Sequence, residues 1–279
     1  MGIGTKTGKA AAFLCAAALI ASLCLLPGCG LKERQGVIVA GSTSVQPYAE
    51  VLEEAYALLY PENIVDVQGG GSSAGITAAE NGTADIGMSS RHLKDAEQGL
   101  WTIEIAKDGL AIIVHPRNPV HNLTLEQIRG IYSAQITNWK QLGGDDAKIH
   151  IITREAGSGT RSAFTDFVMG KDARITQKAI VQDSNGAVRL LVSSDKYAIG
   201  FISLGLVDST VKAIELDGVA ATRENVMNGS YTLLRPFLFV CKEAPTGKVK
   251  DFIDFVMSEE GQRILNKEGL IPAAEGTVG

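Results

Sequence analysis

The stretch "TREAGSGTRSAF" at residues 153–164 contains residue types that bind anions. Two arginines, Arg154 and Arg161, enclose a run of small and hydroxyl residues that includes Ser158 and Thr160. Arginine offers a planar fork of N–H donors, hydroxyl groups add donors, and glycine lets a ligand approach the backbone. A phosphate-binding turn, a serine nucleophile and a flexible charged loop are all compatible with this composition.

Three other segments share this composition, namely "GSTSVQP" (41–47), "GGGSSAG" (69–75) and "MSSRH" (88–92). Each of the four segments follows an expected strand, and three of them lead directly into an expected helix. The first N–H groups of a helix have no intrahelical partner, and they bind either a Ser/Thr cap or an anion. One such junction is usually an ordinary cap. Four of them at the carboxyl ends of strands predict an anion site, because ligands of open α/β sheets bind there.

Strand-like and helix-like segments alternate along the chain. The apolar runs predict strands at 36–41, 64–68, 84–90, 147–153, 197–204 and 233–240. The helical periodicity predicts helices at 46–62, 74–82, 124–133, 159–170, 184–195, 247–258 and 260–269. This order predicts an α/β fold with a mostly parallel sheet that is covered on both faces.

Two extended segments, 110–116 and 231–237, are candidates for chain crossings between two lobes, and each carries a proline near its end. If both are hinge strands, residues 36–112 and 236–279 form the first lobe and residues 113–235 form the second. Two lobes joined in this way can close over a ligand in the cleft between them. Extended segments could equally be core strands, so the division is a hypothesis.

The N-terminus has the pattern of a secretory signal. Lys6 and Lys9 precede an apolar run at 10–26, and "LPGC" ends at Cys29. A single membrane-spanning anchor is the alternative, since 17 apolar residues lie at the lower limit for a span. The "LPGC" sequence resembles a bacterial lipobox. We therefore expect a signal peptide at 1–28, lipid (palmitate included) on Cys29, a linker at 29–35 and a location on the outer face of the cell membrane.

The remaining composition excludes several classes of site. After removal of the expected signal only Cys241 is left besides the lipidation site, so we expect no internal disulfide and a buried, apolar role for this residue. His92, His115, His121 and His150 are scattered singly, and we expect neither a metal site nor a cofactor. The mature chain has 24 basic against 31 acidic residues, a formal charge of −7. This charge argues against nucleic acid but not against a small anion.

The alternative to an anion-binding protein is an enzyme, namely a serine hydrolase. The residues at 71–75 match G-x-S-x-G, the nucleophile motif of many serine hydrolases, with Ser73 at its centre. None of the later histidines has a recognisable triad context, and the motif lies in a glycine-rich stretch that serves an anion site equally well. A phosphate-binding P-loop is absent from the sequence, because no G-x-x-x-x-G-K-[ST] occurs.

The segments "AGSTSVQP", "GGGSSAG", "ADIGMSSR" and "REAGSGTRSAF" occur in an order and at separations that resemble a known family. They are similar to the phosphate-binding lipoproteins of high-affinity phosphate ABC importers. The resemblance implies a two-lobed, type II-like periplasmic-binding-protein fold with two hinge strands and phosphate in the interlobe cleft. It also implies a monomeric, non-enzymatic protein that delivers inorganic phosphate to the permease subunits.

The resemblance also implies which residues bind the ligand. The implied donors are Thr43, Ser44, the backbone N–H of Val45, Ser72, Ser90, Arg154, Ser158, Gly159 and Thr160. Four neighbours are expected around them, namely Ser73, Arg91, Glu155 and Arg161. We expect Asn185 to cap a helix rather than to line the cleft.

Two positions depart from the family pattern. Ser90 and Ala156 stand where several family members carry an aspartate. An aspartate at the first position accepts the proton that phosphate keeps near neutral pH, whereas fully ionised sulfate leaves that carboxylate unpaired and repelled. Glu155 is a candidate to replace the missing carboxylates. The alternative ligand is therefore another oxyanion, such as sulfate or molybdate, in the same fold.

Overall fold

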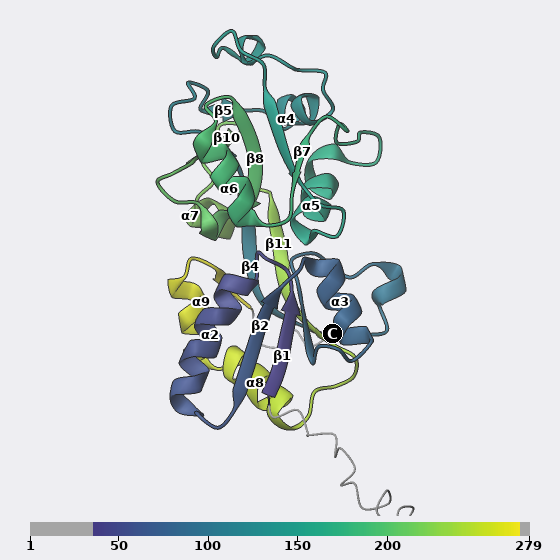
Figure 1. Ribbon diagram of the computed structural model, residues 1–279. Coiled ribbons are helices and arrows are strands. Elements are labelled where there is room, and N and C mark those ends of the chain that lie inside the picture. Colours follow the sequence, from purple (N-terminus) through teal and green to yellow (C-terminus); the bar gives the residue numbers. More distant parts are fainter. Residues whose placement is uncertain (1–35, 274–279) are drawn as a thin grey trace, which may run out of the picture. The chain divides into compact units, whose positions relative to one another are not determined.

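The computed structural model describes residues 36–273 (Figure 1). The expected signal peptide at 1–28, the linker at 29–35 and the lipidation site Cys29 lie outside the described residues. Within residues 36–273, no helix is both long and apolar enough to cross a membrane.

A ten-stranded mixed sheet organises the chain, and its main path runs β2-β1-β3-β11-β4-β8-β6-β7. The strands of this path are β1 (Gly36–Gly41), β2 (Ile64–Gly69), β3 (Ile86–Ser89), β4 (Trp101–Val114), β6 (His150–Arg154), β7 (Ile180–Gln182), β8 (Ala198–Ser203) and β11 (Leu234–Cys241). The short strands β9 (Lys212–Ala213) and β12 (Ile271–Pro272) pair with β4, while β5 (Asn122–Leu123) and β10 (Glu215–Leu216) form a separate pair.

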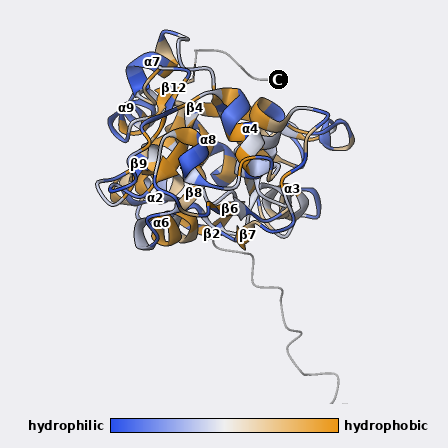
Figure 2. Ribbon diagram, turned by 90° about the horizontal axis from the view of Figure 1, so that it is seen from above, coloured by the Kyte–Doolittle hydropathy of each residue, from blue (hydrophilic) through white to orange (hydrophobic). Residues whose placement is uncertain are grey.

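Helices cover the sheet, and Figure 2 shows that they carry both hydrophilic and hydrophobic residues. They are α2 (Gln46–Leu59), α3 (Ser72–Glu80), α4 (Leu125–Tyr132), α5 (Gly159–Phe164), α6 (Asn185–Ser194), α7 (Arg223–Met227), α8 (Gly247–Met257) and α9 (Glu259–Lys267). An amphipathic helix buries its apolar face against the sheet and leaves the other face to water. In α2, for example, Leu52 and Tyr56 are buried whereas Glu50 is exposed.

Two large hydrophobic cores lie along the long strands β4 and β11. The first half of β4 contributes Ile103 and Ile105 to one core, in which Phe239 of β11 also packs. The second half of β4 contributes Leu110 and Ile112 to the other core. Figure 1 shows both strands passing from one half of the structure to the other. Both strands therefore connect the two cores without a break.

The structure corrects two expectations and adds a strand segment that the sequence did not predict. The sheet is parallel where β1 pairs with β2 and β3 and where β6 pairs with β7 and β8. The prediction of a mostly parallel sheet is wrong for the centre, because β11 and β4 run antiparallel to their neighbours. The helix predicted at 159–170 ends at Phe164 and continues as a π-helical segment, Thr165–Met169. Residues 101–109, which carry no strong strand pattern, form the first half of β4.

A close helix-to-strand contact positions the second candidate loop. A side chain at Gly75 would place its Cβ 2.4 Å from the carbonyl oxygen of Ala40, so α3 lies directly on β1. Only glycine allows such an approach. Because Ser72 is the first residue of α3, this contact holds it at the edge of the sheet where β1 and β3 also end.

Candidate oxyanion site

The candidate loops meet in a buried polar cluster. The loop after β1 contacts the loop after β6 through a hydrogen bond of 2.7 Å between Ser44 Oγ and Thr160 Oγ1. The buried polar side chains there are Ser42, Ser44, Ser72, Ser90, Arg154, Ser158, Thr160 and Asn185. Buried polar groups need partners, so a cluster of this kind is either saturated internally or completed by a ligand.

Asn185 connects two hydroxyl groups of the first loop. Its Nδ2 lies 3.3 Å from Thr43 Oγ1 and 2.9 Å from Ser44 Oγ. The backbone N–H of Ser203 donates to Asn185 Oδ1 at 3.2 Å, and this contact fixes the amide with its NH2 group toward the hydroxyls. The expectation that Asn185 caps its helix is wrong, because Ser184 is the N-cap and its side chain accepts from the N–H of Ala187.

A second group of hydroxyls surrounds Ser90. Ser42 Oγ donates to Ser90 Oγ at 2.9 Å, and Ser72 Oγ lies 3.3 Å from the same atom. The backbone N–H of Ser90 also donates to Ser72 Oγ. Gly159 packs against this group so closely that a Cβ would lie 2.2 Å from Ser72 Oγ and 2.6 Å from Ser90 Oγ. The loop after β6 can therefore reach these serines only with glycine at position 159.

Arg154 is almost fully buried at the end of β6 and has one free donor atom. Its Nε and Nη2 donate to the two carboxylate oxygens of Glu155 at 2.9 and 3.0 Å, and Nη2 also donates to Thr43 Oγ1 at 3.1 Å. Its Nη1 is buried and has no partner within residues 36–273. Burial lowers the pKa of Arg154, and the nearby charge of Glu155 opposes that shift.

The remaining residues of the loop after β6 hold its shape. The N–H of Arg161 donates to Ser158 Oγ, and this contact caps α5. Arg161 Nη1 donates to the carbonyl of Arg154 at 2.8 Å and so braces the strand end.

In the loop after β1, the N–H of Val45 donates to the carbonyl of Ser42 at 3.0 Å. Val45 is therefore near the cluster with its backbone donor already engaged.

Arg91 lies beside the cluster in an ion pair. Its Nη1 and Nη2 donate to the carboxylate of Glu97 at 2.7 and 2.9 Å, and the hydrogen bonds from Arg91 lower the pKa of Glu97. Arg91 Nη2 also lies 3.3 Å from Ser73 Oγ. Arginine stays protonated and cannot serve as a general base, so the surroundings of Ser73 do not resemble those of an activated nucleophile.

Sequence reasoning missed a second buried arginine. Arg235 of β11 donates through Nε and Nη2 to Asp108 Oδ2 on β4 at 3.1 and 2.9 Å, and Nη2 also reaches Ser44 Oγ at 3.1 Å. Ser203 Oγ donates to Asp108 Oδ1. Arg235 and Asp108 face each other in the strand register, which no local motif encodes. The available signal was Arg235, the one charged residue within the apolar segment of β11, whereas Asp108 is one of three charged residues in β4.

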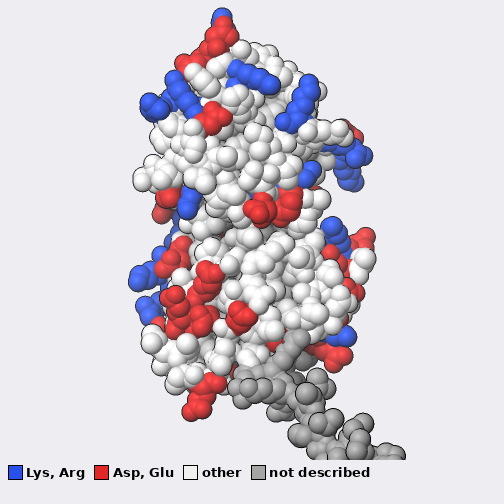
Figure 3. All heavy atoms as spheres, in the orientation of Figure 1, with Lys and Arg blue, Asp and Glu red and all other residues white. Residues whose placement is uncertain are grey.

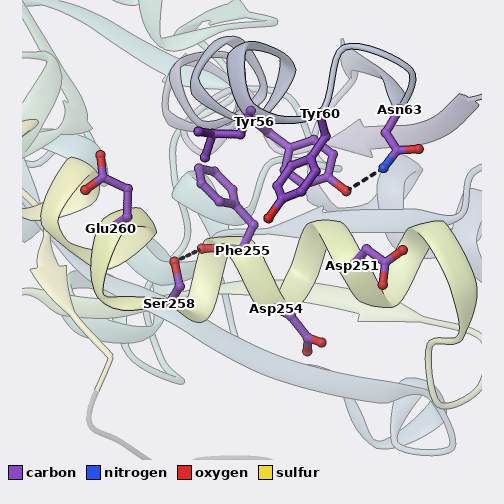
Figure 4. A pocket seen from close by; sticks show the side chains of 9 residues that line it. Tyr56, Tyr60, Asn63, Asp251, Asp254, Phe255, Ser258 and Glu260 are labelled. Atoms are coloured by element: carbon purple, nitrogen blue, oxygen red, sulfur yellow. Dashed lines mark hydrogen bonds between the residues drawn. The ribbon is translucent and has the colours of Figure 1, made fainter.

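Two pockets help to delimit the site. A pocket of about 430 Å³ joins the loop after β3 to α5 and is lined by Arg91, Lys94, Ala156 and Arg161, among others. A pocket of about 490 Å³ lies between α2 and α8, with Tyr56, Tyr60, Asp251 and Asp254 in its wall (Figure 4). None of the residues that line the second pocket belongs to the hydroxyl cluster. The first pocket is lined by Arg91, which follows Ser90 of the cluster, and by two further basic residues, Lys94 and Arg161.

Acidic side chains, the free cysteine and possible metal ligands complete the survey of charged and reactive groups. On the face drawn in Figure 3, acidic side chains gather over the part that holds α2 and β2. Cys241 is buried, as expected, and burial raises the pKa of its thiol to about 12. In the described part of the chain, no three His, Cys, Asp or Glu side chains are close enough together to hold a metal ion.

Comparisons with known proteins give the class and then the family. A model of the PBP superfamily domain matches residues 30–260. A solved structure from Clostridium perfringens, described as a phosphate ABC transporter substrate-binding protein with bound phosphate, is 48% identical, has a TM-score of 0.83, and covers 86% of this chain and 100% of its own. An ABC-type phosphate transport receptor from Vibrio cholerae is 43% identical, with a TM-score of 0.71 and coverage of 85% and 100%.

The fold is therefore the two-lobed α/β fold of periplasmic binding proteins, as the sequence predicted. The phosphate-binding protein PstS of Bacillus subtilis is 30% identical over 250 residues, which are 88% of this chain and 83% of that protein. The chain belongs to the PBP superfamily and, within it, to the family of PstS phosphate-binding proteins.

Proposed function

We propose that this protein captures inorganic phosphate in the cluster between the loops after β1 and β6 and delivers it to the permease of an ABC importer. The observation that carries the proposal is the buried, unpartnered Nη1 of Arg154 within a group of hydroxyls. A buried charged donor without a partner is costly, and a bound oxyanion would remove that cost. The names of the three relatives reported above all state phosphate, and they support the choice of anion.

The hydrogen bonds of the Thr43 and Ser158 hydroxyl groups support a site whose groups donate to the ligand. Thr43 Oγ1 lies within hydrogen-bond distance of Arg154 Nη2 and Asn185 Nδ2, which can only donate, so its own proton is available to another acceptor. Ser158 Oγ accepts from the N–H of Arg161, and this bond leaves the hydroxyl proton available. A dry site for a tetrahedral anion needs such outward-facing donors. We propose no nucleophile, general base or cofactor.

The proposed ligand set is the one expected from the family pattern. It comprises Thr43, Ser44, Val45, Ser72, Ser90, Arg154, Ser158, Gly159 and Thr160. Val45 would have to release the carbonyl of Ser42 before its N–H could bind phosphate. We propose supporting roles for the other four neighbours, since Glu155 and Arg161 hold Arg154 and its loop while Arg91 contacts Ser73.

Capture by lobe closure follows from the position of the cluster. We propose that residues 36–112 and 236–279 form one lobe, that residues 113–235 form the other, and that β4 and β11 act as the hinge strands. Core packing supports this division in outline, because Ile103 and Phe239 belong to one core and Phe201 to the other, although Leu110 and Ile112 already pack in the second core. We further propose an extracytoplasmic monomer that is anchored by lipid on Cys29 after removal of residues 1–28.

A second oxyanion is the competing ligand, and one observation favours it. Both oxygens of Glu155 already accept hydrogen bonds from Arg154, and Ser90 brings no carboxylate. The site therefore has no carboxylate dedicated to the proton of phosphate, and its discrimination against sulfate or molybdate should be smaller than that of a site with an aspartate.

Calorimetric titration of the full-length protein in detergent tests these alternatives. Phosphate, sulfate and molybdate are titrated between pH 6 and 8.5, and ester hydrolysis is assayed in parallel. We expect phosphate binding at micromolar concentration or below, weaker sulfate binding and no turnover. Equal binding of sulfate would contradict the choice of phosphate, and turnover that depends on Ser73 would favour the hydrolase.

A further inference from the structure

Arg235 and Asp108 form a fully buried pair for which phosphate capture, as proposed above, requires no direct role. Each side chain is 1% exposed, and the two lie on the strands that connect the cores. Asp108 is held by Ser203 through its other oxygen. The pair touches the cluster at one atom, Ser44 Oγ, which accepts from Arg235 Nη2.

The direction of the hydrogen bonds at Ser44 follows from the donors around it. A hydroxyl oxygen has two lone pairs and one proton. Arg235 Nη2 and Asn185 Nδ2 can only donate, and they occupy both lone pairs of Ser44 Oγ at 3.1 and 2.9 Å. The third neighbour, Thr160 Oγ1 at 2.7 Å, must therefore accept the proton of Ser44. Thr160 then has its own proton free to donate.

We propose that Arg235, held by Asp108, is a positioning residue that acts through Ser44 to direct the hydroxyl proton of Thr160 toward the bound oxyanion. Without Arg235, a lone pair of Ser44 is unfilled, so Thr160 can donate back to Ser44 and present an acceptor to the anion. The inference rests on the proposed function, because Thr160 is taken to face the ligand. It assigns to the hinge strands a second task besides joining the lobes.

The chain of hydrogen bonds from Arg235 through Ser44 to Thr160, here called the relay, also depends on how the loop after β1 is placed against α5 and α6. Ser44 follows β1, whereas Thr160 and Asn185 belong to α5 and α6, which are distant in sequence. The arginine contributes its donor from β11. Four segments meet at Ser44 and Thr160, so the direction of the Thr160 proton depends on how these segments are placed relative to one another.

A double-mutant cycle between Arg235 and Thr160 tests the relay in the full-length protein. The pair variant Asp108→Asn/Arg235→Met removes both charges together and so avoids an unpaired buried ion. We expect about a tenfold loss of phosphate affinity from the pair variant and at least as much from Thr160→Val. Because both act on one hydrogen bond, the combined variant should bind within about threefold of Thr160→Val alone.

Multiplication of the two losses, or unchanged affinity in the pair variant, would overturn the relay. Arg189→Gln is the matched control, since Arg189 bonds the carbonyl of Leu206 and should leave phosphate affinity unchanged. If the pair variant does not fold, Asn185→Ala tests the other donor to Ser44 in the same cycle. If the wild-type protein binds sulfate or molybdate but not phosphate, the proposed function fails, and the cycle run with that anion still decides the relay.

Discussion

The two buried arginines of the site differ in their carboxylate partners. Arg154 is paired with its sequence neighbour Glu155, whose side chain is 29% exposed. Arg235 is paired across the sheet with Asp108, and both are 1% exposed. Each arginine donates Nη2 to one of two consecutive hydroxyls, Thr43 or Ser44, and each has a buried Nη1 without a partner in the described chain.

The difference in exposure between Glu155 and Asp108 agrees with the two proposed roles, in which Arg154 binds the anion and Arg235 positions Thr160. Water can solvate Glu155 when Arg154 turns part of its charge to an anion, so Arg154 can exchange partners at low cost. Asp108 has no such access, and removal of its partner would leave an unpaired buried charge. We therefore expect changes at Arg154 to affect ligand affinity chiefly, and changes at Arg235 to affect stability as well.

The largest effect on binding is expected from Arg154→Ala. The variant loses the only guanidinium that the family pattern places on the ligand, and charged hydrogen bonds of this kind support at least about a 100-fold loss of phosphate affinity. Calorimetric titration measures the loss of phosphate affinity, and the melting temperature of the ligand-free protein measures any change in stability. Persistent binding with near wild-type affinity would show that the anion binds elsewhere.

The largest effect on stability is expected from Arg235→Met alone. Breaking one side of a buried ion pair costs about 3–5 kcal/mol of unfolding free energy. Burial raises the pKa of Asp108, and loss of the opposing charge of Arg235 raises it further. A carboxyl whose folded pKa exceeds its unfolded value of about 4 loses stability as the pH rises through the folded pKa.

The destabilisation by Arg235→Met should therefore be small near pH 4 and grow toward pH 8. Urea unfolding of the variant and the wild type at pH 4, 6 and 8 measures it. A difference in unfolding free energy that stays constant with pH would contradict the uncompensated charge. The pair variant Asp108→Asn/Arg235→Met serves as the control and should show no such dependence.

Local patterns predicted one of these arginines and not the other. Arg154 lies in a segment of glycine and hydroxyl residues after an apolar strand, and such junctions can be recognised from a few neighbouring residues. The pairing of Arg235 with Asp108 depends on the register of β4 against β11, which joins residues far apart in the chain. Asn185 was misassigned for a related reason, since its partners Thr43 and Ser44 come from a distant loop.

The fold was predicted more completely than the site. Strands with apolar runs and amphipathic helices were found close to their positions, because burial alone dictates these patterns. The antiparallel centre was missed because its first half, residues 101–109, mixes charged and apolar residues. Charged residues inside a strand weaken the periodic signal, and here one of them, Asp108, is the buried partner of Arg235.

A moderate effect on phosphate affinity is expected from Gly159→Ala, which tests the contact of the loop after β6 with Ser72 and Ser90. The new Cβ would lie within 2.6 Å of Ser72 Oγ and Ser90 Oγ, so the loop after β6 could no longer approach these serines. We expect about a tenfold loss of phosphate affinity in calorimetric titration and, because the clash lies in a buried cluster, a loss of about 1–3 kcal/mol of unfolding free energy. Gly157→Ala is the matched control, because its Cβ meets Ser73 at an ordinary 3.7 Å. Equal effects of the two variants would contradict the steric explanation.

Ser90→Asp is expected to change selectivity more than affinity. A carboxylate at this position can accept the proton of phosphate but faces an unprotonated oxygen of sulfate. The ratio of phosphate to sulfate affinity should rise by about tenfold or more, as measured by paired titrations at pH 7. An unchanged ratio would mean that residue 90 does not face a ligand oxygen, and Ser89→Ala provides a neighbouring control.

The smallest effect is expected from Glu155→Gln, which completes the comparison of the two carboxylates. Glutamine can keep one hydrogen bond to Arg154, and the lost charge is partly screened by water, so the unfolding free energy should fall by less than about 1 kcal/mol. Phosphate affinity should stay within about threefold of the wild type. Asp108→Asn, the matched substitution at the buried pair, should lower the unfolding free energy by more, because Arg235 then lacks a carboxylate in a dry environment. Similar losses of stability in these two variants would show that the exposure of the carboxylate does not distinguish the roles of the two arginines.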